Sequence, residues 1–197
     1  CSLGSILSVM DSGWSPACLN EPSNSIDVWG VLKTTSVQKM SFLNFENKTL
    51  PANKEPKPQY EVRPGDILIT RAGPRNRVGI SCLVKNTRPK LMISDKLIRF
   101  QLISNLMSKT FISLCLNAGP SAIHIEKSKS GMADSQVNIS QNQLKATPIP
   151  LPPSHEQHRI VAKVDELMAL CDQLKNSLQQ AQETQTLLTD AVVENAI

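Results

Sequence analysis

The 197-residue sequence lacks the long apolar segments that mark membrane and secreted proteins. No apolar run approaches the roughly 18 residues that a membrane-spanning helix needs, and no signal-peptide pattern opens the chain. Internal repeats and low-complexity tracts are also absent. With 40% apolar residues, the chain is long enough for one ordinary domain plus an extension, and we expect no membrane association.

Paired cysteines are missing as well. The cysteines are odd in number and widely scattered, and none lies in a Cys-x-x-Cys motif. This pattern predicts free thiols and a reducing, cytoplasmic compartment. The five are Cys1, Cys18, Cys82, Cys115 and Cys171. Because the chain begins with Cys1 rather than Met, we expect a fragment or a processed chain.

The sequence has none of the common catalytic motifs. Its eight glycines are dispersed, so no phosphate-cradling loop is present, and there is no Gly-x-Ser-x-Gly elbow. His155 and His158 are three residues apart rather than the four of a metal-binding helix, and no third ligand is placed by a motif. Cys115 lies in an apolar helical run that is typical of a core position. We therefore expect no catalysis, no metal and no cofactor.

Aromatic side chains are scarce, whereas positive charge is concentrated. One tyrosine and four phenylalanines give little support for stacking on single-stranded bases, which favours duplex over single-stranded nucleic acid. Residues 63–109 contain ten Lys and Arg against only Asp66 and Asp95, while residues 154–197 contain three basic against seven acidic groups. This asymmetry indicates a nucleic-acid partner, and the alternative is a solvated basic face without one.

The N-terminal part, residues 1–147, is predicted to be a mixed α/β domain with a small twisted sheet, and the whole chain belongs to the α+β class. A turn at Pro64-Gly65-Asp66 feeds an expected strand at 67–70, with its hairpin partner at 78–84 and a third strand at 96–101. Helical spacing of apolar residues predicts a helix through Leu106, Met107, Phe111 and Leu114. Gly119-Pro120 is expected to end this helix. Ser140 and Gln143 predict a cap that opens a short helix.

The loop between the first two predicted strands is the strongest binding candidate. Arginine forks suit phosphates and the guanine edge, and asparagine suits the adenine edge. Small residues beside them allow close approach to a groove. The candidates in this loop are Arg71, Arg75, Asn76 and Arg77. Additional contacts to the nucleic-acid backbone are expected from Lys33, Thr34, Thr35, Lys127 and Lys129.

A change in composition separates this domain from a long helix. Four prolines within residues 148–153 predict an extended, stiff connector. Ser154 and Gln157 then form a capping-box signal, and no Gly or Pro follows in 154–197. Apolar or small residues recur at alternating steps of four and three along this segment, and the one polar exception is Gln185. The positions are Ile160, Val164, Leu167, Cys171, Leu174, Leu178, Ala181, Gln185, Leu188 and Val192. This heptad pattern predicts a left-handed coiled coil, and the alternative is a helix packed along its own domain.

Several segments resemble the specificity subunit of Type I restriction-modification enzymes. The run PIPLPPSHEQHRIVAKVDELMALCDQL from Pro148 to Leu174 is similar to that family's conserved region. The run RPGDILITRAGP from Arg63, followed by Arg77-Val78-Gly79, resembles the strand–loop–strand signature of its target-recognition domains. Residues 94–96 and 130–140 fit as well, so the resemblance covers about residues 60–197.

The resemblance implies a non-catalytic reader of one half of a bipartite duplex DNA site. In that family two long helices pair antiparallel as a ruler between the half-sites and dock methyltransferase subunits, which use S-adenosylmethionine, and the restriction subunit then joins. This chain has one recognition domain and one helix, so the resemblance implies either a fragment or a half-subunit that forms a homodimer. Two other hypotheses stay open: a coiled-coil interaction module with an incidental basic patch, and an enzyme with an unrecognised site.

Overall fold

The computed structural model describes the backbone of residues 1–194 and the side chains of residues 1–190. The chain divides into a first unit, Cys1–Gln157, and a second unit that begins at His158. Mixed sheets with short helices build the first unit, and one long helix forms the second, so the predicted α+β class is confirmed. The predicted proline connector, residues 148–153, lies within the first unit.

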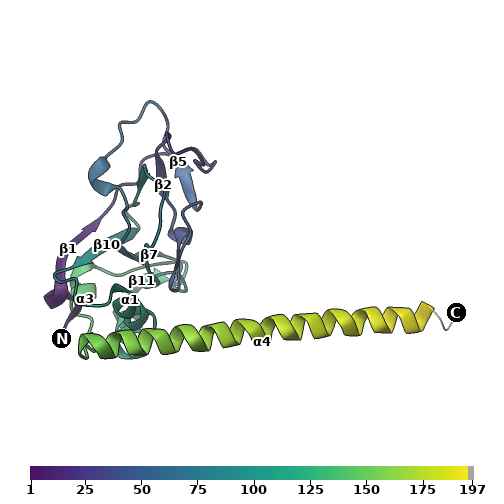
Figure 1. Ribbon diagram of the computed structural model, residues 1–197. Helices are drawn as coiled ribbons and strands as arrows, with labels where there is room; N and C mark the ends of the chain where they lie inside the picture. The colour runs from purple at the N-terminus through teal and green to yellow at the C-terminus, as the bar shows by residue number, and fades with distance from the viewer. Residues whose placement is uncertain (195–197) are drawn as a thin grey trace. The chain divides into compact units, whose positions relative to one another are not determined.

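The first unit consists of short elements (Figure 1). Its strands are β1 (Leu7–Ser12), β2 (Gly30–Leu32), β3 (Val37–Gln38), β4 (Ser41–Phe42), β5 (Asn47–Thr49), β6 (Ile67–Thr70), β7 (Ala72–Gly73), β8 (Ser81–Leu83), β9 (Leu91–Met92), β10 (Leu97–Leu102), β11 (Ser130–Ala133) and β12 (Gln136–Asn138). Its helices are the 3-10 turns η1 (Leu3–Ile6), η2 (Thr34–Ser36) and η3 (Pro58–Tyr60), and the α-helices α1 (Lys109–Asn117), α2 (Gly119–Ser128) and α3 (Gln141–Lys145). The helix α4 (Ser154–Glu194) begins in the first unit and forms the second.

The main sheet has the strand order β1-β10-β6-β8, and all its pairs are antiparallel. The predicted hairpin is confirmed, because Leu68 of β6 pairs with Cys82 of β8. The second strand is shorter than the predicted 78–84, since Val78 N–H donates to Pro74 and Gly79 N–H to Thr70 in a turn. The predicted third strand also exists as β10, which lies on the other side of β6 and beside β1 in Figure 1.

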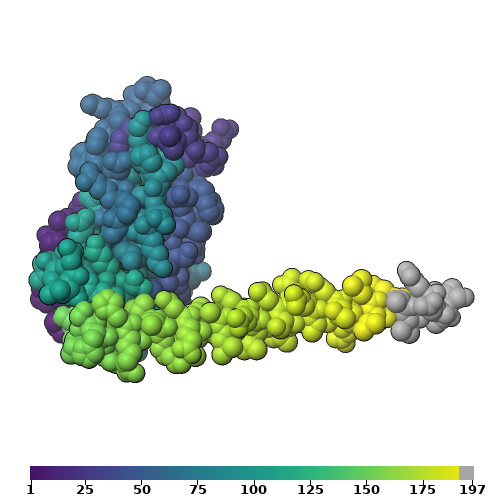
Figure 2. Space-filling view, viewed as in Figure 1, coloured from purple at the N-terminus to yellow at the C-terminus, as the bar shows by residue number. Residues whose placement is uncertain are grey.

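The core of the first unit is built on the two central strands of this sheet. All four residues of β6 are buried, so its apolar run has no solvent-facing side. Leu97, Ile98 and Phe100 of β10 are equally buried. Segments far apart in sequence therefore pack together, as shown by purple N-terminal atoms against teal atoms from the middle of the chain (Figure 2).

Three smaller sheets surround the core: β5-β2-β9, β11-β12-β7 and the pair β3-β4. The pairing of β2 with β9 is parallel, whereas β2 pairs with β5 in antiparallel register. Non-local parallel pairing leaves little local signal, and the sequence did not predict these strands. The pairing of β2 with β5 places side chains from these two strands next to each other.

Two predicted helices of the first unit form with modified bounds. Ser108 accepts a hydrogen bond from Phe111 N–H and caps α1, so the expected helical positions Leu106 and Met107 lie before it, and Leu106 is 78% exposed. The helix ends at Asn117, before Gly119 and Pro120, as predicted. A second helix, α2, which was not predicted, then starts at this Gly-Pro pair.

The capping box of α3 is confirmed in both directions between Ser140 and Gln143. The helix α4 starts at Ser154, as expected. There the Ser154 hydroxyl donates to Leu106 O, and Gln157 Oε1 accepts from Ser108 N–H. These contacts fix the first turn of α4 to the segment that precedes α1.

The 41-residue helix α4 is about 60 Å long at 1.5 Å per residue. From Leu167 onward the described apolar stripe is exposed, with Leu174 at 57%. The side chain of Val192, the last predicted pairing position, lies outside the described residues. Over the described residues, no helix is both long and apolar enough to cross a membrane. All five cysteines are free thiols.

Candidate nucleic-acid interface

Three lysines converge on one hollow of the first unit. The hollow has a volume of about 450 Å³ and is lined by Lys33, Lys48 and Lys96 together with the hydroxyl-bearing Thr34 and Ser94. Among the described residues, the exposed Lys96 side chain has no hydrogen-bond or ion-pair partner, and Lys48 Nζ donates to the neutral Asn20 Oδ1 at 3.1 Å and to no carboxylate. At least two of the three ammonium groups are therefore not neutralised by a carboxylate.

Sheet pairing brings these lysines together from three parts of the sequence. Lys48 lies on β5 opposite Val31 of β2, and Lys33 follows the last residue of β2. Lys96 comes just before β10, and its carbonyl accepts from Arg71 N–H at 2.9 Å, where β6 ends. The predicted candidates Lys33 and Arg71 thus lie near two lysines that the sequence did not single out.

Arg71 is the one predicted arginine whose side chain has no recorded hydrogen bond or ion pair among the described residues. Its Nε atom is buried without a partner. Because a buried donor without an acceptor is costly, this side chain favours a ligand that can accept from it. Arg71 therefore differs from Arg75 and Arg77, whose guanidinium groups already donate to protein acceptors.

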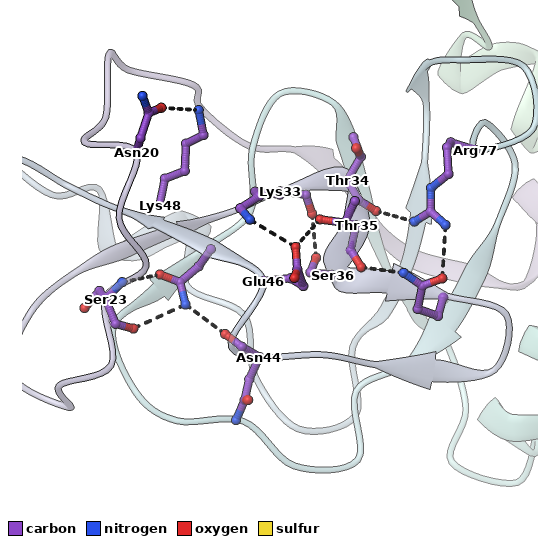
Figure 3. Close-up of polar contacts among 12 residues, drawn as sticks. Asn20, Ser23, Lys33, Thr34, Thr35, Ser36, Asn44, Glu46, Lys48 and Arg77 are labelled. Carbon is purple, nitrogen blue, oxygen red and sulfur yellow. Dashed lines mark hydrogen bonds and ion pairs between the residues drawn. The ribbon is translucent and has the colours of Figure 1, made fainter.

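The turn Lys33–Thr35 is held by Glu46 (Figure 3). Glu46 Oε2 accepts from Lys33 Nζ at 3.1 Å and from the Thr35 hydroxyl at 2.5 Å. The hydrogen bond from Thr35, and next the one from Lys33, lowers the pKa of Glu46 below its ordinary value. Glu46 therefore stays ionised at neutral pH and partly offsets the charge of Lys33.

Arg77 joins the predicted loop to this turn. Its guanidinium donates to the carbonyl oxygen of Thr34 at 2.9 Å (Figure 3). It also donates to the carbonyl oxygen of Val37 at 2.7 Å and to Gln38 Oε1 at 3.0 Å. Two predicted regions more than 40 residues apart are thus brought into contact. Both Nη atoms of the half-buried Arg77 fork therefore donate to protein acceptors, while its Nε is buried without a hydrogen-bond partner among the described residues. DNA contact by Arg77 stays a prediction.

Arg75 and Asn76 lie at the rim of a second hollow of about 650 Å³. Arg75 is ion-paired with Glu126 at 2.8 Å and with Asp134 at 3.5 Å. The hydrogen bond to Glu126 raises the pKa of the Arg75 guanidinium. Asn76 is exposed, so its amide is available for contact. The exposed ion pairs of Arg75 are weak enough to be exchanged for phosphate.

The two predicted lysines near the end of α2 differ in availability. Lys127 is exposed in the last turn of α2. The side chain of Lys129 is only 6% exposed, and its Nζ donates to Arg75 O at 2.8 Å and to Glu126 Oε2 at 2.5 Å. Lys129 therefore supports the Arg75 loop from within, which the sequence had not indicated.

Other cations of the basic segment are also used internally. Arg99 is buried and ion-paired with Asp11 and Asp66, and Arg88 donates to backbone carbonyls that include those of Ser23 and Val28. Lys90 faces Asp27 at 3.7 Å. Residues 63–109 therefore present less positive charge to the solvent than their composition suggested, because several of their cationic side chains bind protein acceptors.

Two findings concern the metal-ligating and thiol side chains of the described residues. They contain no group of three or more His, Cys, Asp or Glu side chains placed to hold a metal ion. Burial raises the pKa of the Cys82 thiol to about 12 and that of Cys115 to about 11, so both thiols are protonated at neutral pH. Neither thiol is an activated nucleophile.

A family model and a related protein of known name both match this chain and point to the same family. The family described as "Type I restriction modification DNA specificity domain" matches residues 20–183. The chain is 57% identical over all of its 197 residues to the Type I restriction enzyme EcoEI specificity subunit of Escherichia coli. It spans 33% of that relative's length.

Two solved structures share the fold. One comes from work on the structural basis of complex assembly and conformational transition of the type I R-M system. It superposes with a TM-score of 0.61 and 22% sequence identity, and the match covers 89% of this chain and 39% of that chain. The other is the HsdS subunit from Thermoanaerobacter tengcongensis, with a TM-score of 0.58 and 21% identity over 89% of this chain and 38% of that one.

Proposed function

Because the chain belongs to the family of Type I restriction modification DNA specificity domains, we propose that its first unit recognises one half of a bipartite site in duplex DNA. The observation that carries the proposal is the hollow on which Lys33, Lys48 and Lys96 converge. Ammonium groups at such a surface neutralise phosphates and release their counterions. The hydroxyls of Thr34 and Ser94 add neutral donors for phosphate oxygens.

Base reading is assigned to two residues of the loop that follows β6. Arg71 follows β6 beside Lys96 and has an unpartnered side chain, so it is our first candidate for the edge of a guanine. Asn76 is exposed and has the donor and acceptor that an adenine edge requires. Arg75 and Lys127 are proposed phosphate contacts, Arg75 after it leaves Glu126 and Asp134.

The helix α4 is proposed to pair with a sister helix and to dock methyltransferase subunits, through which a restriction subunit joins. Its exposed heptad stripe supports pairing, since an apolar stripe along a helix of about 60 Å is stabilised when another helix covers it. The sister helix belongs either to a longer chain of which this is a part or to a second copy. In this proposal the chain itself carries out no chemical step.

Salt dependence of duplex binding tests the proposal. The chain, together with the methyltransferase subunit, should bind duplex DNA with an affinity that falls log-linearly with salt. Lys96→Met should weaken binding to all sequences about equally and reduce the salt slope by about one. Lys145→Met is the matched control, because Lys145 is an exposed lysine outside the hollow. Undetectable duplex binding at low salt would refute the proposal.

The second candidate function is a coiled-coil interaction module with an incidental basic patch. The exposed stripe from Leu167 onward favours it, because pairing needs no DNA. It predicts a chain that forms helix-mediated complexes. Replacing Lys33, Lys48 or Lys96 would then leave its affinity for duplex DNA unchanged. The same salt titration therefore separates the two functions.

A further inference from the structure

Arg77 is attached firmly to the central sheet. The Thr70 hydroxyl, at the end of β6, donates to the carbonyl oxygen of Arg77. The N–H groups of Gly79 and Ile80 donate to the carbonyl and hydroxyl oxygens of Thr70 at 2.8 and 3.1 Å. Thr70 is fully buried, so the backbone that carries Arg77 is fixed to the core of the unit.

The side chain of Arg77 spans from this anchor to the turn that lines the hollow. Its Nη2 donates to the carbonyl oxygens of Thr34, the first residue of η2, and of Val37, the residue that caps the end of η2. Its Nη1 donates to Gln38 Oε1, and Gln38 Nε2 donates in turn to Thr35 O at 2.7 Å. One arginine and one glutamine therefore hold the turn at the carbonyl oxygens of Thr34, Thr35 and Val37, and the first two of these lie on the segment labelled in Figure 3.

The acceptors of Arg77 are all neutral. No ion pair of Arg77 is recorded among the described residues, so its positive charge is not cancelled by a carboxylate. A cation that is fixed by carbonyl oxygens keeps its charge beside the turn that presents Lys33 and Thr34. The clamp thus both orders the turn and adds to the positive potential there.

We infer that Arg77 is a positioning residue for duplex recognition: it holds the turn Lys33–Thr35 at the hollow and does not itself contact DNA. The inference rests on the proposed function and deepens it by separating the residues that bind from the one that orders them. An arginine fork can satisfy several acceptors at once, whereas a lysine ammonium is a point charge on a flexible stem. Geometry, rather than charge alone, is therefore the contribution of Arg77.

Two measurements on the full chain test this role. Hydrogen exchange of the DNA-free protein reports the turn directly, at the N–H groups of Ser36, which donates to Lys33 O, and Val37, which donates to Thr34 O. Duplex affinity as a function of salt, with the methyltransferase subunit present, reports the consequence for DNA. The variants are Arg77→Met, Arg77→Lys and Gln38→Glu, which retains an acceptor for Arg77 but removes the donor to Thr35 O.

The expected result is faster exchange at Ser36 and Val37 in all three variants, with exchange at Leu68 and Phe100 of the core unchanged. Duplex affinity should fall about tenfold or more for both Arg77 variants. The salt slope should keep the parent value, because Arg77 itself touches no phosphate and the lysines of the hollow are all retained. Since Gln38→Glu leaves Arg77 itself in place, it keeps the test decisive if the Arg77 variants do not fold.

Three results would overturn the inference. These are unchanged exchange in the turn, parental affinity in Arg77→Lys, and a salt slope reduced by about one in Arg77→Met, which would make Arg77 a phosphate contact. A parent protein that binds no duplex refutes the proposed function instead, and that result is visible before any variant is made. The two failures are therefore distinguishable.

Discussion

Arg99 and Asp11 face each other as register partners on the antiparallel strands β10 and β1, with Arg99 Nε 3.0 Å from Asp11 Oδ1. The same guanidinium lies 3.8 Å from Asp66, which is fully buried, and donates to the carbonyl oxygens of Gln59 and Glu61. One arginine of the basic segment thus links two strands of the main sheet to the segment before β6. Its role is structural, and it contributes little to the outer positive surface.

Loss of this arginine should destabilise the first unit. In Arg99→Met, Asp66 keeps its hydrogen bonds from Arg63 N–H and Gln101 but loses its cation in a buried setting. We expect the free energy of unfolding to fall by about 3 kcal/mol, as for other broken buried ion pairs. Urea denaturation measures the change. Lys90→Met, which removes the exposed pair with Asp27, is the control and should cost less than about 1 kcal/mol.

The pKa of Glu46 should respond to Thr35 more than to any other neighbour. Its hydrogen bond is the main cause of the lowered pKa, so Thr35→Val should raise the Glu46 pKa toward the ordinary value of 4.5. Carboxyl NMR titration measures this change. Thr49→Val is the matched control, since the Thr49 hydroxyl donates to Glu21 O and not to Glu46.

The same lowered pKa predicts how stability depends on pH. Because the folded pKa of Glu46 is below 4.5, its contribution is fully present above that pH and is lost as pH falls through the folded pKa. The stability difference between the parent and Glu46→Gln should therefore disappear at acid pH. A difference that persists unchanged below the folded pKa would contradict this assignment.

Gly79 should not tolerate a side chain. It has a φ of +86°, and an added Cβ would lie 2.5 Å from Ile125 Cγ2 of α2. Gly79→Ala should therefore lower the free energy of unfolding by about 2 kcal/mol or more, from backbone strain and overpacking together. Gly119→Ala is the control, because its φ is +63° but nothing lies within 4 Å of the new Cβ. Equal losses in thermal unfolding would show that crowding at Ile125 is unimportant.

The pairing stripe of α4 can be tested at Leu174, which is 57% exposed. Copies of the chain should associate through α4, and Leu174→Asp should reduce the mass measured by light scattering to that of a monomer, because a charge would enter the apolar seam. Gln173→Asp, one residue away and off the heptad stripe, should leave the mass unchanged. A dimer that survives Leu174→Asp would show that other surfaces hold the copies together.

Sequence reasoning succeeded where the signals are local or periodic. The β6–β8 hairpin follows from a turn and two apolar runs, the α3 cap from Ser140 and Gln143, and α4 from a heptad and an absence of Gly and Pro. These signals depend on neighbours along the chain. They therefore remain readable without knowledge of the tertiary structure.

The composition of the candidate site was harder to predict. Lys48 and Lys96 reach the hollow only through sheet pairings, including the parallel β2–β9 pair, that carry no local sequence signal. Arg77 and Lys129 were predicted as nucleic-acid contacts without regard to their internal hydrogen bonds, because the sequence does not show which donors the protein itself occupies. Charge counting overestimated how much of the positive charge of residues 63–109 is available, because Arg99 is buried and ion-paired and Arg88 and Lys90 bind protein acceptors.

Recognition of duplex sequence by this chain can be tested by selection from a random duplex library. The chain with its methyltransferase subunit should enrich one short half-site, and Arg71→Met should relax the choice at one position of it, at a cost of about 1–3 kcal/mol against the preferred base. Lys145→Met should recover the parental half-site. Recovery of duplexes with no common sequence would contradict the account.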